Sequence, residues 1–249
     1  MFNLKIANKV FTILNIYTST FDYCVQYITD ESSDFTVPIT QEDIELERVK
    51  SIRDEQMEGV LHHEYSVECL ETTAVQRKIT DFLFDCDVLL FHGSAVAVDG
   101  LGYLFTAKSG TGKSTHTKFW REMFGKRAVM VNDDKPFLQM SDKGVVVYGS
   151  PWNGKHRLGS NISVPLKAMC ILERSTENWI KPISSSEALQ ILFQQSQRPR
   201  NSVNMIKYME LIDKLACRVE FYRMGCNMNP EAALMAYEVM SQERKGTKL

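Results

Sequence analysis

The sequence predicts an α/β protein with a mixed sheet that includes antiparallel hairpins. Short apolar runs of strand character fill the middle of the chain, and turn signals such as Asp99-Gly100 separate them. The region after Ser184 shows mostly helical spacing. With 249 residues, of which 44% are hydrophobic and 24% are charged, the chain has the composition of an ordinary soluble globular protein.

The chain length suits one large domain or one domain with a small N-terminal one, and we place the two parts at residues 1–85 and 86–249. The first is a small N-terminal α/β module. Its sequence shows two β-branched and aromatic stretches typical of strands and then two helix-like stretches, in chain order Val10–Tyr17, Phe21–Ile28, Gln41–Arg53 and Glu68–Phe84. The module has no chemically distinctive motif, so we expect the function to lie in the second domain.

The second domain begins with a series of predicted strands, Val88–Phe91, Ala95–Val98, Tyr103–Thr106, Ala128–Val131, Phe137–Met140 and Val145–Tyr148. The last two form a hairpin around a turn at Ser141–Gly144. An amphipathic helix from about Ser114 to Phe124 interrupts the series and ends at Gly125. The helical C-terminal region is expected to hold three further helices, Glu187–Gln195, Val203–Leu215 and Pro230–Gln242.

Charge and cysteine use exclude several classes of partner and site. The formal net charge of −2 provides no broad basic field, so we expect no nucleic-acid partner. The six cysteines form no CxxC pair and indicate a reducing compartment rather than a disulfide framework or a zinc site. The uncharged run Val10–Phe21 is shorter than the about 20 residues of a transmembrane helix, so we expect a cytoplasmic protein with no membrane partner.

Residues Ala107–Ser114 fit the Walker A pattern of a P-loop, with alanine in place of the first glycine. Gly110 and Gly112 allow backbone N–H groups to turn inward around phosphate oxygens, and the following helix adds the positive end of its dipole. Lys113 is expected to reach the β- and γ-phosphates of a nucleoside triphosphate, and the Ser114 hydroxyl to bind Mg²⁺. The alternative is a chance glycine-rich turn before a helix. The expected phosphate-binding residues are Ser109, Gly110, Thr111, Gly112, Lys113, Ser114 and Thr115.

Two carboxylates and a histidine flank this motif. Asp133 and Asp134 end an apolar strand, where we expect them to share two tasks, the binding of magnesium and the orientation or deprotonation of an acceptor. The alternative is a pair of solvated turn aspartates ahead of Pro136. His92 ends another apolar strand just before Gly93, and a histidine at such a position is by itself more often structural than catalytic.

Three segments together resemble the catalytic core of the HPr kinase/phosphorylase family, which is related in fold to ATP-dependent phosphoenolpyruvate carboxykinase. These segments are Phe91-His92-Gly93, Ser109–Ser114 and Asn132-Asp133-Asp134. The His-Gly pair is the discriminating element, because ordinary nucleotide kinases lack it. The resemblance implies a P-loop core of the HPr kinase / phosphoenolpyruvate carboxykinase type, with ATP and Mg²⁺ as cofactors.

The resemblance also implies a role for each polar residue of these segments. Asp133 becomes the general base, and His92 lies near the transferred phosphate and helps to set the charge on that base. Asp134 binds the magnesium ion together with Ser114, while Lys113 and the loop amides hold the triphosphate. The family forms hexamers, so the resemblance leaves a homo-oligomer open for this chain.

The resemblance changes beyond Tyr148. The Glu-Arg-Gly-Leu-Gly signature of the family is missing there, and Gly149–Lys155 and Asn161–Lys167 take its place. That combination looks like a group of HPr-kinase-like proteins, some of which phosphorylate serine on precursor peptides. Lys155 and Arg157 are candidates to hold phosphate charge in the transition state, or they form a solvated basic turn.

The sequence therefore predicts an ATP-dependent phosphotransferase that transfers the γ-phosphoryl group of ATP–Mg²⁺ to a hydroxyl acceptor, such as a serine of a peptide or protein. Two alternatives stay open. A kinase for a small metabolite would suit Arg198 and Arg200 as a lid, although these residues are otherwise exposed loop charges. A nucleotide-binding regulator with little turnover would need neither the Asp pair nor His92.

Overall fold

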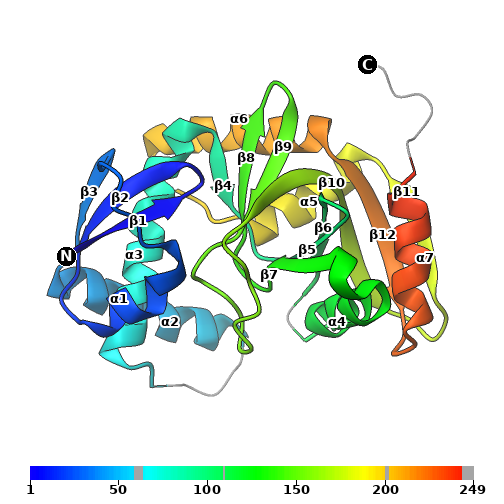
Figure 1. The fold of residues 1–249 in the computed structure, drawn as a ribbon, viewed down its shortest axis with the longest axis horizontal. Helices are drawn as coiled ribbons and strands as arrows, with labels where there is room; N and C mark the ends of the chain where they lie inside the picture. Colours follow the sequence, from blue (N-terminus) through cyan, green and yellow to red (C-terminus); the bar gives the residue numbers. More distant parts are fainter. Residues whose placement is uncertain (59–63, 109, 200–201, 243–249) are drawn as a thin grey trace. The chain divides into compact units, whose positions relative to one another are not determined.

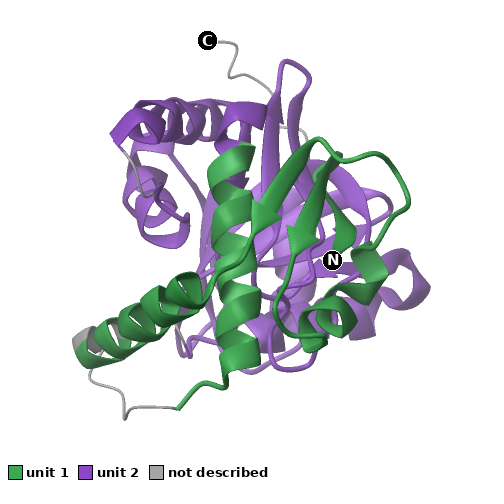
Figure 2. Ribbon diagram, turned by 90° about the vertical axis from the view of Figure 1, so that its left-hand side faces the viewer, with its two compact units in different colours: residues 1–83 green, residues 84–249 purple. Residues whose placement is uncertain are grey.

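The structure is a computed structural model of the chain and describes residues 1–58, 64–108, 110–199 and 202–242. It divides into two compact units, Met1–Leu83 and Phe84–Leu249 (Figure 2). Each unit contains its own sheet. Within the described ranges, no helix is long and apolar enough to cross a membrane.

The first unit is built on a three-stranded sheet with the strand order β1-β2-β3. β1 pairs antiparallel with β2, and β2 pairs parallel with β3. Its elements are β1 (Phe2–Ile6), β2 (Lys9–Leu14), α1 (Ser19–Cys24), η1 (Val25–Tyr27), β3 (Phe35–Pro38), α2 (Gln41–Glu58) and α3 (Val67–Leu83). The two helices predicted in this region are confirmed, as is a strand within Val10–Tyr17.

The stretch Phe21–Ile28, which has the composition of a strand, is helical instead and falls in α1 and η1. The buried carboxylate of Glu71 accepts hydrogen bonds from the Thr20 hydroxyl and from two backbone N–H groups just ahead of it, and so holds the turn that leads into α1. Thr20 and Cys24 are buried, and the residue after each of them is exposed. Buried positions four residues apart have the period of a helix, not of a strand.

The second unit contains a nine-stranded sheet, of which seven strands follow the order β4-β8-β9-β10-β6-β5-β7. β12 pairs with β10, and β11 pairs with β12. The strands are β4 (Val88–Leu90), β5 (Ser94–Val98), β6 (Leu101–Thr106), β7 (Ala128–Asn132), β8 (Phe137–Ser141), β9 (Gly144–Tyr148), β10 (Ser163–Arg174), β11 (Trp179–Ile183) and β12 (Glu220–Cys226). The helices are η2 (Phe84–Cys86), α4 (Lys113–Phe124), η3 (Gly125–Arg127), α5 (Ser185–Gln195), α6 (Ser202–Arg218) and α7 (Glu231–Met240).

β10 organises this sheet. Its first residues, Ser163–Pro165, pair antiparallel with β9, and the remainder pairs parallel with β6 and with β12. Neither β10 nor β12 is predicted from the sequence. The expectation of a mostly helical region after Ser184 is wrong at β12, which is a strand. The reason is burial: Ala168–Leu172 of β10 are all buried, and a strand buried on both faces has no alternation to display.

Helices cover both faces of the larger sheet. α4 and α7 pack together on one face, and α5 and α6 pack together on the other (Figure 1). Successive side chains of β6 point to opposite faces of the sheet. Tyr103 and Phe105 join the apolar cluster under α4 and α7, whereas Leu104 joins the cluster under α5 and α6. The sheet is therefore the middle layer of three.

The strand directions bring several chain segments to one edge of this sheet. β6, β10 and β12 are parallel, so their carboxyl ends lie together. β5 is antiparallel to both β6 and β7, so the start of β5 and the end of β7 lie at the same edge. We call this the loop edge. Ligands of α/β sheets bind outside the carboxyl ends of the strands, and the sequence-predicted site residues follow or precede these strands.

Candidate functional site

The glycine loop, Ala107–Gly112, connects the end of β6 to the start of α4 at the loop edge. Gly110 and Gly112 have φ angles of 74° and 117°, a region that residues with a side chain rarely adopt. The strand–loop–helix arrangement that the sequence motif requires is thus present. Ser109, one of the predicted phosphate-binding residues, lies outside the described residues.

Lys113 begins α4 and lies half-buried at the mouth of the glycine loop. Its Nζ is 3.5 Å from the carbonyl oxygen of Ala107. Burial lowers the pKa of Lys113, and the negative charge of Asp134 acts in the opposite direction. Ser114 is exposed and Thr115 is partly buried, so the first turn of α4 offers two hydroxyl groups beside this cation.

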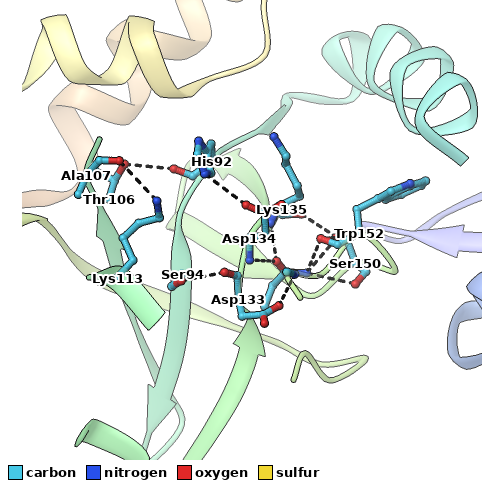
Figure 3. A network of polar contacts seen from close by, with 12 residues as sticks. His92, Ser94, Thr106, Ala107, Lys113, Asp133, Asp134, Lys135, Ser150 and Trp152 are labelled. Carbon is cyan, nitrogen blue, oxygen red and sulfur yellow. Dashed lines mark hydrogen bonds and ion pairs between the residues drawn. The ribbon is translucent and has the colours of Figure 1, made fainter. Parts of the chain in front are cut away.

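His92 lies next to Asp134, with 3.2 Å between its Nε2 and the Oδ1 of the carboxylate (Figure 3). Backbone contacts fix the histidine: its N–H donates to the carbonyl of Gln195 at the end of α5, and its carbonyl accepts from the Thr106 hydroxyl at the end of β6. The two side chains are 33% and 32% exposed, so the pair remains accessible to a ligand.

The charges around Asp134 favour its ionised form. Burial alone would raise the pKa of this carboxyl, but the hydrogen bond from His92 and the positive charges of Lys135 and Lys113 hold the pKa below its ordinary value. Asp134 is therefore an anion that faces both an imidazole and the lysine of the glycine loop. The amide N–H of Gly93 donates to the Asp134 carbonyl, which ties the two strand ends together.

Asp133 faces a different part of the chain. Its Oδ1 accepts a hydrogen bond from the Gly154 N–H at 2.7 Å, and its carbonyl accepts from the Ser94 hydroxyl at 2.8 Å. The residue is only 8% exposed. The resemblance groups His92 with Asp133, whereas the structure pairs His92 with Asp134, because the turn after β7 points the two neighbouring carboxylates toward different partners.

Asn132, which the sequence analysis treats only as part of a motif, organises both aspartates. Its buried side-chain oxygen accepts from the backbone N–H groups of Asp134 and Lys135, at 2.8 and 2.6 Å. Its Nδ2 donates to the carbonyl and hydroxyl oxygens of Ser150. An asparagine that closes a buried strand before two polar residues is a turn signal that would have revealed this role.

The loop after β9 reaches the candidate site through Gly154. A Cβ at Gly154 would lie 3.2 Å from Asp133 Oδ2, so the close approach of this loop to the carboxylate favours glycine. Lys155 and Arg157 follow as exposed residues. The loop therefore carries two exposed cations next to Gly154. That Lys155 and Arg157 hold phosphate charge stays a prediction.

Arg174 is a second residue that sequence reasoning missed. It ends β10, and its Nη2 donates to the Gly110 carbonyl at 2.7 Å. No local motif marks this arginine, since only the parallel pairing of β10 with β6 brings it to the glycine loop. Of the two arginines weighed as a lid, Arg198 is exposed, and Arg200 lies outside the described residues.

The donor set suits a magnesium ion that is bound mainly by phosphates. Among the described residues, no three His, Cys, Asp or Glu side chains gather into a metal site of their own. Mg²⁺ at a nucleotide site takes one or two protein ligands and completes its shell with phosphate oxygens and water. The Ser114 hydroxyl and the Asp134 carboxylate fit that requirement chemically, and both residues are accessible.

Comparison with known proteins identifies a family. The chain is similar in structure to the HPr(Ser) kinase/phosphatase from Coxiella burnetii, with a TM-score of 0.36 and 11% sequence identity, over 61% of this chain and 97% of that one. No curated protein matches the chain. Residues 62–239 match the family model described as SynChlorMet cassette protein ScmC. Because this match spans more than half of the sequence, the chain belongs to the family of the SynChlorMet cassette protein ScmC.

Proposed function

We propose that the chain is an ATP-dependent phosphotransferase of the HPr-kinase-like type, which transfers the γ-phosphoryl group of ATP–Mg²⁺ to a serine hydroxyl of a peptide or protein. The observation that carries the proposal is the arrangement at the loop edge. A glycine loop with the cation of Lys113 lies at the same sheet edge as the His92–Asp134 pair. Nucleotide binding alone would need no such pair, which favours transfer over a regulator.

The glycine loop and the start of α4 would bind the triphosphate. The positive-φ glycines of the loop have the backbone conformation that lets N–H groups turn toward phosphate oxygens, and the N-terminus of α4 adds the positive end of its dipole. Lys113 neutralises charge on the β- and γ-phosphates. When bound by Ser114 and Asp134, Mg²⁺ would supply charge compensation for the phosphate oxygens.

The hydrogen bonds support a division of labour between the two aspartates that differs from the one implied by the resemblance. His92 takes the proton of the acceptor hydroxyl, and the Asp134 carboxylate orients its imidazole, because the two side chains are hydrogen-bonded to each other and partly exposed. The acceptor oxygen then bonds to the γ-phosphorus, and the bond to the bridging oxygen breaks as ADP leaves. Asp133 positions the loop after β9 through Gly154.

The experiment incubates the full chain with ATP, Mg²⁺ and synthetic serine-containing peptides. ADP release and peptide phosphorylation are followed by mass spectrometry. Lys113→Ala is expected to lower transfer by about 10²- to 10³-fold, the usual cost of one lost charge-stabilising contact. Lys118→Ala is the matched control, because this lysine lies on the same helix, is 60% exposed and pairs with Glu122. Transfer that survives Lys113→Ala, or that never occurs in the unaltered chain, contradicts the proposal.

A further inference from the structure

A cavity of about 460 Å³ lies beside the glycine loop, between α4 and the ends of β10 and β12. Its volume falls in the range of about 300–1,000 Å³ that is usual for ligand pockets. We call it the α4 cavity, and its defining wall residues are Gly110, Thr111, Thr115, Phe119, Asn227 and Met228. Thr115 and Phe119 are four residues apart on α4, so they share the face that borders it.

The strand order sets the α4 cavity apart from the residues proposed to transfer phosphate. His92 precedes β5 and Asp134 follows β7, on one side of β6, whereas the cavity lies at β10 and β12 on the other side. The glycine loop follows β6 and lies between the His92–Asp134 pair and the α4 cavity. A triphosphate whose terminal phosphate lies at Lys113 and Asp134 therefore extends along the loop toward the α4 cavity.

Arg174 links the loop to the cavity wall. It lines the α4 cavity and donates a hydrogen bond to the Gly110 carbonyl. The loop segment that borders the cavity is thus held in place by the end of β10. A group attached to the phosphates would emerge against this wall.

We propose that the α4 cavity binds the nucleoside of the triphosphate and recognises the faces of its base rather than the hydrogen-bonding edge. The proposal rests on the phosphotransfer function proposed above and names the part of the site that holds the donor's base. Phe119 and Met228 supply the apolar contact for the ring faces, and Met228 is 73% exposed at the rim.

Two polar side chains of the wall, Asn227 and Ser175, are already hydrogen-bonded within the protein. The Asn227 amide donates to the Thr176 carbonyl at 3.0 Å and accepts from the Asn229 N–H at 2.8 Å. The Ser175 hydroxyl accepts from the Glu177 N–H at 3.3 Å. Side chains bonded in this way discriminate weakly between base edges, so adenine and guanine nucleotides should bind alike.

The experiment measures calorimetric binding of Mg²⁺–ATP, Mg²⁺–GTP and Mg²⁺–tripolyphosphate to the full chain. We expect ATP and GTP to bind with dissociation constants within about tenfold of each other, and tripolyphosphate to bind about tenfold or more weakly because it lacks the stacked base. Phe119→Ala should weaken both nucleotides about tenfold and leave tripolyphosphate unchanged. Met123→Ala is the matched control, because Met123 lies on α4, is 39% exposed and is not part of the cavity wall.

The outcomes separate this inference from the proposed function. Since Phe119 also packs against the core, Met228→Ala provides a second variant at a residue that is mostly exposed. If tripolyphosphate binds as tightly as ATP, or if both variants leave nucleotide affinity unchanged, the cavity assignment is wrong while phosphate binding stands. A preference of more than about tenfold between ATP and GTP overturns recognition by the faces of the base. If none of the three ligands binds, the phosphotransfer proposal fails and this inference fails with it.

Discussion

Two histidines lie on either side of the glycine loop in regions of opposite character. His92, at the loop edge, has a side chain that is 33% exposed and lies 3.2 Å from the Asp134 carboxylate. His116, in the first turn of α4, is 2% exposed, and its Nε2 accepts a hydrogen bond from the Trp120 indole N–H at 3.1 Å. Burial lowers the pKa of His116 to about 4.

The difference shows that distance from the loop along the sequence is a poor guide to chemistry. His116 is the nearer of the two to Lys113 in sequence, yet it faces the aromatic cluster of Phe105 and Trp120 and stays neutral near pH 7. His92 is farther away in sequence, but strand pairing brings it to a carboxylate at the open edge. A partner that can share a proton, together with exposure, makes a histidine a candidate for catalysis.

Among the variants that test this difference, His92→Gln is expected to have the largest effect on phosphoryl transfer. Removing the imidazole should lower phosphoryl transfer by about 10²- to 10⁴-fold, the usual contribution of an acid–base group. The melting temperature should hardly change, because the contacts that fix this residue to Gln195 and Thr106 are made by its backbone. Steady-state transfer rates and thermal melting of the same preparation are measured. A large fall in melting temperature, with full activity in the fraction that remains folded, would make His92 structural.

His116 should instead control stability in acid. The folded protein binds its proton less readily than the unfolded chain, because its pKa falls from 6.5 to about 4. Its contribution to stability is therefore complete above about pH 6.5 and is lost as the pH falls toward 4, by about 3 kcal/mol at roughly 1.4 kcal/mol per pKa unit.

Urea unfolding of the unaltered chain and of His116→Gln at pH 7 and pH 4 checks this prediction. Glutamine offers an oxygen to the Trp120 indole but does not titrate, so the difference between the two proteins isolates the histidine from the carboxylates. An equal loss of stability in both proteins between pH 7 and pH 4 would contradict it.

The two aspartates provide the next comparison. Asp134→Asn should lower transfer by about 10²-fold, because the charge beside His92 and Lys113 is lost. Asp133→Asn should change the rate by less than about tenfold, since an asparagine oxygen can still accept the Gly154 N–H. Transfer rates and nucleotide affinity are measured for both variants. If Asp133→Asn removes transfer and leaves nucleotide affinity normal, Asp133 is the base and the resemblance gives the correct roles.

The smallest effect expected is that of His116→Leu at neutral pH. Leucine keeps much of the apolar contact but leaves the buried Trp120 N–H without its acceptor, which costs about 1–3 kcal/mol of unfolding free energy. Urea unfolding at pH 7 is compared with His116→Gln, which retains an acceptor. Equal stability of the two variants would show that this hydrogen bond contributes little.

Features set by neighbouring residues could be predicted from the sequence. The glycine loop and the hairpin of β8 and β9 depend on short segments, in which glycines and turn residues select the backbone conformation. The start of α4 was placed within one residue, because the loop motif is followed directly by an amphipathic pattern. The mixed α/β fold class follows from the same local signals.

Features that depend on distant pairing could not be predicted. The choice of Asp134 over Asp133 as partner of His92 depends on how β5 and β7 meet, and on the turn that Asn132 stabilises. Arg174 reaches Gly110 across 64 residues only because β10 and β6 run side by side. The buried β10 also escaped detection, since it shows no alternation of polar and apolar residues.

The place of β10 in the sheet has a consequence for the order of folding. The β5–β6 and β8–β9 hairpins join residues that are close in sequence. By contrast, β10 brings Arg174 to Gly110, which lies 64 residues earlier in the chain. Contacts of such long range form slowly, because the entropy of loop closure is lost before the contacts are gained. A chain in which only the two hairpins have formed still lacks β10, whose Arg174 holds the glycine loop through Gly110. Recovery of nucleotide binding during refolding should therefore lag behind the formation of secondary structure.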